Sequence, residues 1–80
     1  MNTIEVVAQR ILQLCEEKGF TVNGISNWAG VSHSTVHSIF DGKSKNHGIV
    51  TIKKLCDGFG ITLAEFFDTK EFDELEQEIK

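Results

Sequence analysis

The chain has 80 residues, of which 40% are hydrophobic and 25% charged, and its formal net charge is −4. A chain of this length forms one small domain with a modest core, and the composition is typical of a globular protein. No apolar run approaches the roughly 20 residues of a membrane span and no signal peptide is present, so the sequence predicts a cytoplasmic protein without a membrane partner.

The charge is unevenly distributed along the chain. Residues 1–67 carry six basic and six acidic residues, whereas residues 68–80 carry six acidic and two basic ones. We therefore expect a neutral domain over 1–67 and an acidic C-terminal tail over 68–80. The tail is either a further helix, with Phe72, Leu75 and Ile79 on one stripe, or a frayed end. Its apolar stripe could pack back on the domain or pair with a second copy.

Residues 4–18 show the strongest helical periodicity, with Thr3 as the expected cap and Gly19 as the expected stop. Cys15 lies on the apolar stripe of this helix, and Cys56 lies on the stripe of a later one. Two such cysteines favour free thiols in the core over a disulfide, a redox pair or a metal site.

Residues 21–40 predict two short helices, at about 22–28 and 33–40, joined by a tight turn. Thr21 and Ser32 can cap the two helices, and Gly30 can adopt the positive φ of the turn. The side chains expected to face inward are Ile25, Trp28, Val31, Val36, Ile39 and Phe40. Those expected to face outward are His33, Ser34, Thr35, His37 and Ser38. A helix that is apolar behind and small and polar in front suits insertion into a DNA major groove.

The second half of the chain predicts two more helices. Asp41-Gly42 ends the preceding helix, and residues 43–50 form a loop whose first half is basic and polar. Thr51 is the expected cap of a helix at 52–59, which Gly60 stops, and Thr62 is the expected cap of a short helix at 63–67. The prediction is an all-α fold of five short helices without strands.

In order and spacing, these elements resemble the phage lambda repressor-like (Cro/repressor, Xre) helix-turn-helix family. The resemblance covers about residues 4–67. It is carried by Arg10-Ile11, by Lys18-Gly19-Phe20-Thr21, by Gly30 to Ile39, by Gly42-Lys43 and by Thr51 to Phe67. It implies a compact five-helix domain in which the second and third helices form the helix-turn-helix, and the third reads double-stranded DNA.

The resemblance also assigns candidate contact residues. The positions implied to contact bases are His33, Ser34, His37 and Ser38. Those implied to contact the DNA backbone are Asn23, Ser32, Thr35, Lys43, Lys45 and Thr51. Family members commonly carry Gln where this chain has Val22, and Asn23 could substitute for it. They also carry an Arg–Glu pair where this chain has Cys15 and Phe40, two apolar groups that can pack together.

The function predicted from these patterns is that of a sequence-specific DNA-binding transcriptional regulator, with repression as the favoured role, acting as a homodimer on a palindromic site. The alternative is a protein-interaction module on the same scaffold, such as an antitoxin that binds its toxin. His33 and His37 share a helix face, but no further ligand at metal spacing completes a site. No spacing indicates catalysis, and we expect no cofactor, metal or small-molecule substrate.

Overall fold

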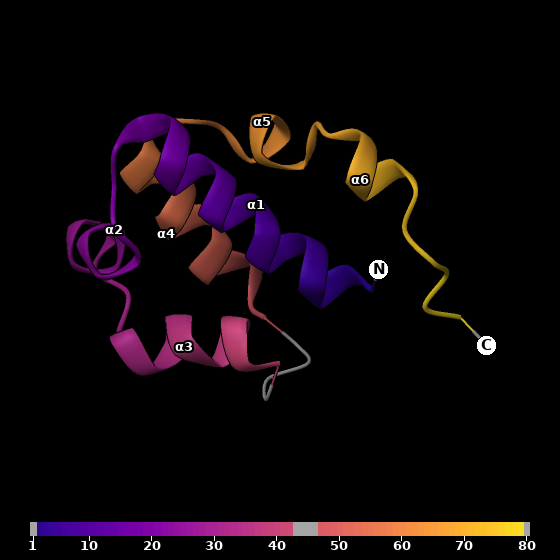
Figure 1. Cartoon of the computed structure of the whole chain (residues 1–80), viewed down its shortest axis with the longest axis horizontal. Coiled ribbons are helices and arrows are strands. Elements are labelled where there is room, and N and C mark those ends of the chain that lie inside the picture. Colours follow the sequence, from indigo (N-terminus) through magenta and orange to yellow (C-terminus); the bar gives the residue numbers. More distant parts are fainter. Residues whose placement is uncertain (1, 43–46, 80) are drawn as a thin grey trace.

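The computed structural model describes residues 2–42 and 47–79, and within them the chain is all-α (Figure 1). The helices are α1 (Thr3–Lys18), α2 (Val22–Ala29), α3 (His33–Asp41), α4 (Ile49–Phe59), α5 (Leu63–Phe67) and α6 (Lys70–Asp73). The described part of the chain thus contains one helix more than the five expected. None of its helices is long and apolar enough to cross a membrane.

Side-chain caps begin the two helices of the helix-turn-helix, as the sequence predicts. The hydroxyl of Thr21 accepts a hydrogen bond from the Gly24 amide at 2.9 Å, and that of Ser32 accepts from the Thr35 amide at 3.2 Å. Between them Gly30 adopts φ 70°, a left-handed conformation that side chains resist. These local signals fix where α2 ends and α3 begins.

Two other helix starts differ from the prediction. Asn2, and not Thr3, caps α1, because its side chain accepts from the Glu5 amide and Thr3 is already helical. Thr51 does not cap α4. Gly48 holds the N-cap position in an extended conformation, and its carbonyl accepts from the Ile52 amide, so the first turn of α4 contains residues 49–51.

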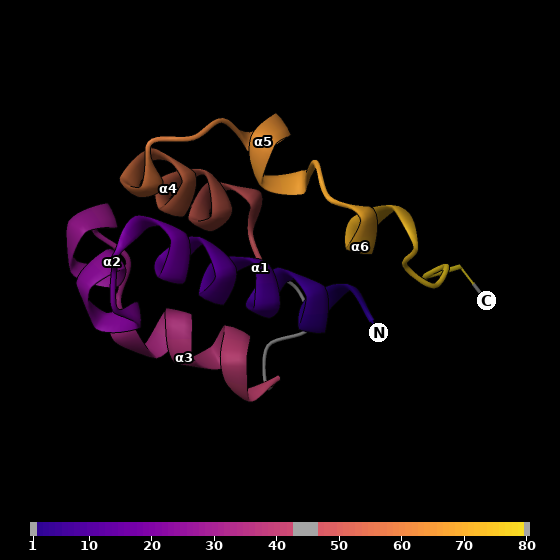
Figure 2. The ribbon, with the colours of Figure 1, turned by 45° about the horizontal axis from the view of Figure 1, so that its top comes forward.

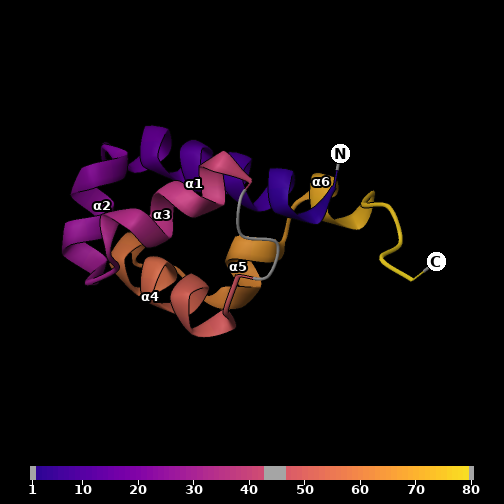
Figure 3. The same cartoon turned by 90° about the horizontal axis from the view of Figure 1, so that it is seen from below.

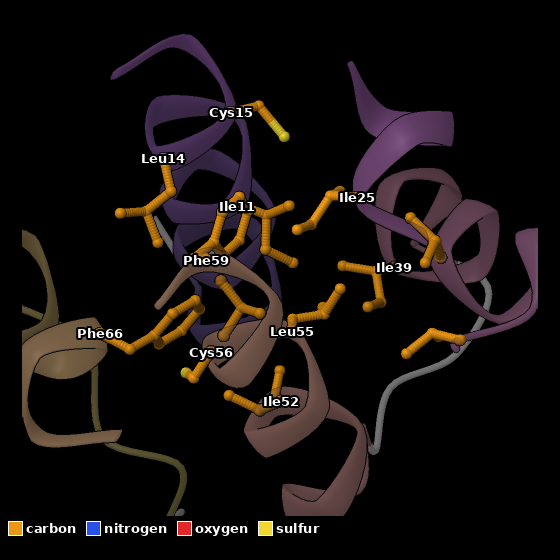
Figure 4. Packing of buried hydrophobic residues seen from close by; sticks show 13 residues of the cluster. Ile11, Leu14, Cys15, Ile25, Ile39, Ile52, Leu55, Cys56, Phe59 and Phe66 are labelled. Carbon is orange, nitrogen blue, oxygen red and sulfur yellow. The ribbon is translucent and has the colours of Figure 1, made fainter. Parts of the chain in front are cut away.

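The core lies where α1, α2, α3 and α4 meet (Figure 4). Its buried cluster consists of Val7, Ile11, Leu14, Cys15, Ile25, Val31, Val36, Ile39, Ile52, Leu55, Cys56, Phe59 and Phe66. Both cysteines are free and buried, as predicted. Phe40 packs partly buried against the same cluster as Cys15, so the two apolar side chains share one core, as predicted.

The prediction that Trp28 faces inward is wrong. Its side chain is 73% exposed, although Ile25 on the same helix is fully buried. The reason is the close packing of α2 on α4 at Gly58. A Cβ built on Gly58 would lie 3.0 Å from Ile25 and 3.4 Å from the Trp28 ring, so only the edge of the indole meets α4.

The C-terminal segment packs back on the domain through aromatic side chains. The rings of Phe66 and Phe67 have centroids 4.9 Å apart, and Phe72 from α6 lies 5.0 Å from Phe67 and 6.0 Å from Phe66. In Figures 1 and 2, α5 and α6 lie on the side of α1 and α4 opposite to α3. Beyond α6, Ile79 is 89% exposed, so only part of the predicted apolar stripe is used.

Candidate nucleic-acid interface

The two faces of α3 differ in chemistry. Val36 and Ile39 are 1% exposed and anchor the helix on the core. On the other face His33, Ser34 and His37 are exposed and Ser38 is half-buried. Seen from below in Figure 3, α3 lies in front of the rest of the domain, where its outer face can meet a partner. The structure thus brings the four sequence-predicted base-contacting residues together on one accessible helix.

The turn before α3 determines how this helix is presented. The Val31 amide donates to the Ser26 carbonyl at 3.0 Å, and the Gly30 amide donates to the Asn27 carbonyl at 3.3 Å. These bonds satisfy carbonyls that the end of α2 would leave unpaired. Val31 is buried directly after the turn. The angle between α2 and α3 is therefore held by backbone bonds and by one apolar anchor.

The hydroxyl groups at the start of α3 bond to one another. A hydrogen bond of 2.7 Å joins Ser32 Oγ and Thr35 Oγ1, and a longer one of 3.4 Å joins Ser32 Oγ and Ser34 Oγ. One turn on, the Ser38 hydroxyl donates to the Ser34 carbonyl at 2.9 Å. The predicted contact residues of α3 therefore form an ordered polar strip.

A side chain of α2 also belongs to this surface, although the sequence analysis missed it. Asn27, in the last turn of α2, places its Oδ1 atom 2.9 Å from Nε2 of His33. Both side chains are exposed. The sequence holds a weak signal for this pair, because an amide six residues before the first residue of α3 lies just across the turn.

Two of the predicted backbone contacts lie in the first turns of other helices. Asn23 is exposed in the first turn of α2, and Thr51 is half-buried in the first turn of α4. No side chain caps the start of α4, so amides of its first turn have no side-chain acceptor. Such amides are the groups with which helix N-termini bind phosphate. Lys43 and Lys45, the predicted basic contacts, lie outside the described residues.

The buried thiols do not contribute reactive groups to the surface. Burial raises the pKa of the Cys15 thiol, and burial together with the nearby Asp57 carboxylate raises the pKa of Cys56. Both thiols therefore stay protonated and act as small apolar side chains in the core. Across residues 2–42 and 47–79, no three His, Cys, Asp or Glu side chains are grouped as metal ligands would be.

In this domain a capped helix is followed by a glycine turn and a second short helix. The second helix is anchored through its apolar face and presents a polar face to the outside. This arrangement is the helix-turn-helix of DNA-binding proteins. Residues 10–71 match the family model of the Cro/C1-type HTH DNA-binding domain. The chain therefore belongs to the Cro/C1-type family, as the sequence resemblance predicted, and it is a DNA-binding regulator.

A solved structure supports the same assignment. The chain is similar to the protein in "Crystal structure of the prophage Lp1 protein 11", with a TM-score of 0.84 and 36% sequence identity. The match covers 94% of this chain and 100% of that one. A comparison with curated protein sequences finds no significant match.

Proposed function

We propose that the protein is a sequence-specific transcriptional repressor that inserts α3 into the DNA major groove and binds a palindromic site as a homodimer. The observation that carries this proposal is the outer face of α3. His33, Ser34 and His37 are exposed on it, while Val36 and Ile39 hold the opposite face rigidly on the core. The resemblance to phage repressors favours the negative regulatory role.

Phosphate contacts on both sides of α3 would orient it in the groove. The candidates are Asn23 in the first turn of α2, the start of α4, and Lys43 and Lys45, which follow α3 in the sequence. Contacts of this kind fix the register of a protein on DNA but carry no base information. Because residues 1–67 have equal numbers of basic and acidic side chains, we expect few such contacts and a shallow dependence of affinity on salt.

The small size of the recognition surface supports the proposed homodimer. One α3 offers four candidate base contacts, which is little for a specific site, and two copies related by a twofold axis double the contacts. The two helices would read half-sites about 34 Å apart, one turn of B-DNA. Binding of this kind needs no catalysis, cofactor or small-molecule substrate.

The test is selection of bound DNA from a random pool. We expect the wild-type protein to enrich a palindrome. Ser34→Glu should abolish the enrichment, because a carboxylate on the outer face of α3 repels the DNA. This variant should fold, since an acidic residue in the first turn of a helix interacts favourably with the helix dipole.

Gln9→Glu is the matched control, because it adds the same charge at an exposed position of α1. It should retain the palindrome. Loss of enrichment in both variants would mean that added negative charge, and not the position on α3, causes the effect. Absence of any enriched sequence with the wild-type protein would overturn the proposal.

A second candidate function is that of a protein-interaction module, such as an antitoxin that binds its toxin. The observation that favours it is Trp28, a large apolar side chain left 73% exposed. If no DNA sequence is enriched, this function becomes the preferred one, and Trp28→Ser should then weaken the binding of a protein partner.

A further inference from the structure

One of the candidate base-contacting residues is held by a side chain from another helix. Nε2 of His33 lies 2.9 Å from Oδ1 of Asn27, so a hydrogen bond spans the turn between α2 and α3. The backbone of Asn27 is fixed in the last turn of α2, where its main-chain carbonyl accepts the amide of Gly30. The imidazole of His33 is thus tethered to the rigid part of the helix-turn-helix.

The chemistry of this bond determines which ring nitrogen carries the proton. The amide oxygen of Asn27 has no hydrogen, so the imidazole must donate through Nε2. A neutral imidazole has one N–H, and the remaining nitrogen, Nδ1, then keeps its lone pair. Without this partner the ring could rotate and exchange between its two tautomers, and it could offer either a donor or an acceptor at the same place.

We propose that Asn27 is a positioning residue that fixes His33 as a hydrogen-bond acceptor, and that this acceptor reads a base carrying an exocyclic amino group. In the major groove these groups are N6 of adenine and N4 of cytosine, whereas guanine and thymine present acceptors at the corresponding positions. The proposal rests on the proposed function and adds to it the class of base that one residue of α3 selects.

The same bond explains how an exposed histidine can discriminate between bases. An unconstrained imidazole satisfies a donor or an acceptor equally well and carries little sequence information. Once Nε2 is occupied, a guanine O6 or thymine O4 opposite Nδ1 would leave two lone pairs facing each other. The choice of base at this position therefore depends on Asn27, although Asn27 itself need not touch the DNA.

The test compares Asn27→Leu and Asn27→Asp with the wild-type protein in the selection experiment. In the wild-type site, one position of each half-site should prefer adenine or cytosine on the contacted strand. Asn27→Leu, of similar size but without an acceptor, should reduce this preference by about fivefold while leaving the rest of the site unchanged. Asn27→Asp keeps an acceptor oxygen and should retain the preference, even though its charge weakens the binding of all sequences.

His33→Ala provides the control for the mechanism. It should remove the preference, and adding Asn27→Leu to it should change the preference no further, since the two residues act as one unit. An unchanged preference in Asn27→Leu would overturn the proposal. A further loss of preference in the double variant would do so too, because Asn27 would then read the base directly.

A measurement without DNA separates this proposal from the proposed function. Nitrogen-15 NMR of the imidazole should show Nε2 protonated and Nδ1 unprotonated in the wild-type protein, with both shifts moving towards those of free histidine in Asn27→Leu. Protonation at Nδ1 in the neutral wild-type ring would overturn the tautomer assignment. If the NMR signature is present but no DNA sequence is enriched, the proposed function fails and the base-reading role fails with it, while the tautomer assignment stands.

Discussion

At the scale of single residues, Gly58 determines how α2 lies on α4. A side chain at this position would meet the Ile25 methyl at 3.0 Å and the Ala29 Cβ at 3.1 Å, closer than ordinary contacts between carbons. The glycine therefore allows α2 to approach α4 and leaves Trp28 at the rim of the interface. The periodicity of α2 predicted an inward Trp28, because a sequence pattern shows which residues share a face but not how closely the neighbouring helix approaches.

We predict that Gly58→Ala destabilises the fold by about 1 kcal/mol. Overpacking a close contact destabilises a fold by about 1–3 kcal/mol. Replacing a glycine inside a helix by alanine stabilises the helix by up to about 1 kcal/mol and so offsets part of this loss. Urea unfolding measures the change, and the emission of Trp28, the only tryptophan, reports on the contact directly.

Lys54→Ala is the control, because it alters an exposed residue of the same helix and should stay within about 0.5 kcal/mol of the wild type. A Gly58→Ala protein that is more stable than the wild type would show that α2 can move aside without cost.

At the scale of secondary-structure elements, α5 depends on α1. With five residues it is too short to be stable alone. Thr62 and Glu65 form a capping box at its start, and the Arg10 guanidinium of α1 donates to the carbonyls of Phe66 at 2.8 Å and Glu65 at 2.9 Å at its end. The Glu65 carbonyl also accepts the Asp68 amide at 3.4 Å, so Arg10 adds a second bond there and supplies a donor to the Phe66 carbonyl. It also brings positive charge to the negative end of the helix dipole.

We predict that Arg10→Met lowers the free energy of unfolding by about 2 kcal/mol. The methionine keeps the apolar stem but removes both charged donors, and hydrogen bonds to charged groups contribute about 1.5–3 kcal/mol. Urea unfolding again gives the measurement.

The matched control is Gln13→Ala, which removes only the exposed side-chain partner of the same guanidinium. It should change the stability by less than about 0.5 kcal/mol. Equal losses in the two variants would locate the stabilisation on the surface of α1 and not at the end of α5.

The elements also show which parts of the fold could be read from the sequence. The caps at Thr21, Ser32 and Thr62 and the stop at Gly60 depend on residues within a few positions, so the local sequence predicts them. The Arg10 contact joins residues 56 positions apart, and nothing in the local sequence indicates it. The small polar face of α3 was likewise predictable from spacing, whereas the Asn27–His33 bond depends on the geometry of the turn. The base and backbone contacts themselves stay predictions.

At the scale of the whole molecule, the negative charge lies away from the recognition helix. Residues 1–67 are balanced, and the surplus lies in the tail that follows α5. Phe72 anchors α6 on Phe66 and Phe67, and the Thr3 hydroxyl donates to the Glu78 carboxylate at 2.8 Å. Helix α6 is thereby held on the side of α1 and α4 opposite to α3, and the chain beyond it runs past the N-terminal end of α1 (Figure 1). We expect this charge to repel DNA over a distance without covering the outer face of α3.

We predict that replacing Glu71, Glu74 and Glu76 by glutamine, which changes the net charge from −4 to −1 and keeps the Glu78 contact, speeds association with DNA at low salt. The difference from the wild type should nearly vanish at about 0.15 M salt, where the screening length is about 8 Å. Stopped-flow association rates over a salt series provide the measurement. A gain in rate that persists at high salt would mean that the tail touches the DNA or α3 directly.

The polar strip of α3 has a consequence for the role of water in DNA recognition. The Ser38 hydroxyl donates to the Ser34 carbonyl of its own helix, and the hydroxyls of Ser32, Ser34 and Thr35 bond to one another. Most of the hydrogen-bonding groups that these side chains leave free are therefore acceptor lone pairs. The edges of the bases in the major groove are also rich in acceptors. Two acceptor surfaces meet best through water molecules that donate to both, and ordered water can carry real sequence specificity. Recognition by this helix would then retain part of its hydration layer, and the choice of site would depend on where water can bridge as much as on which side chains reach the bases.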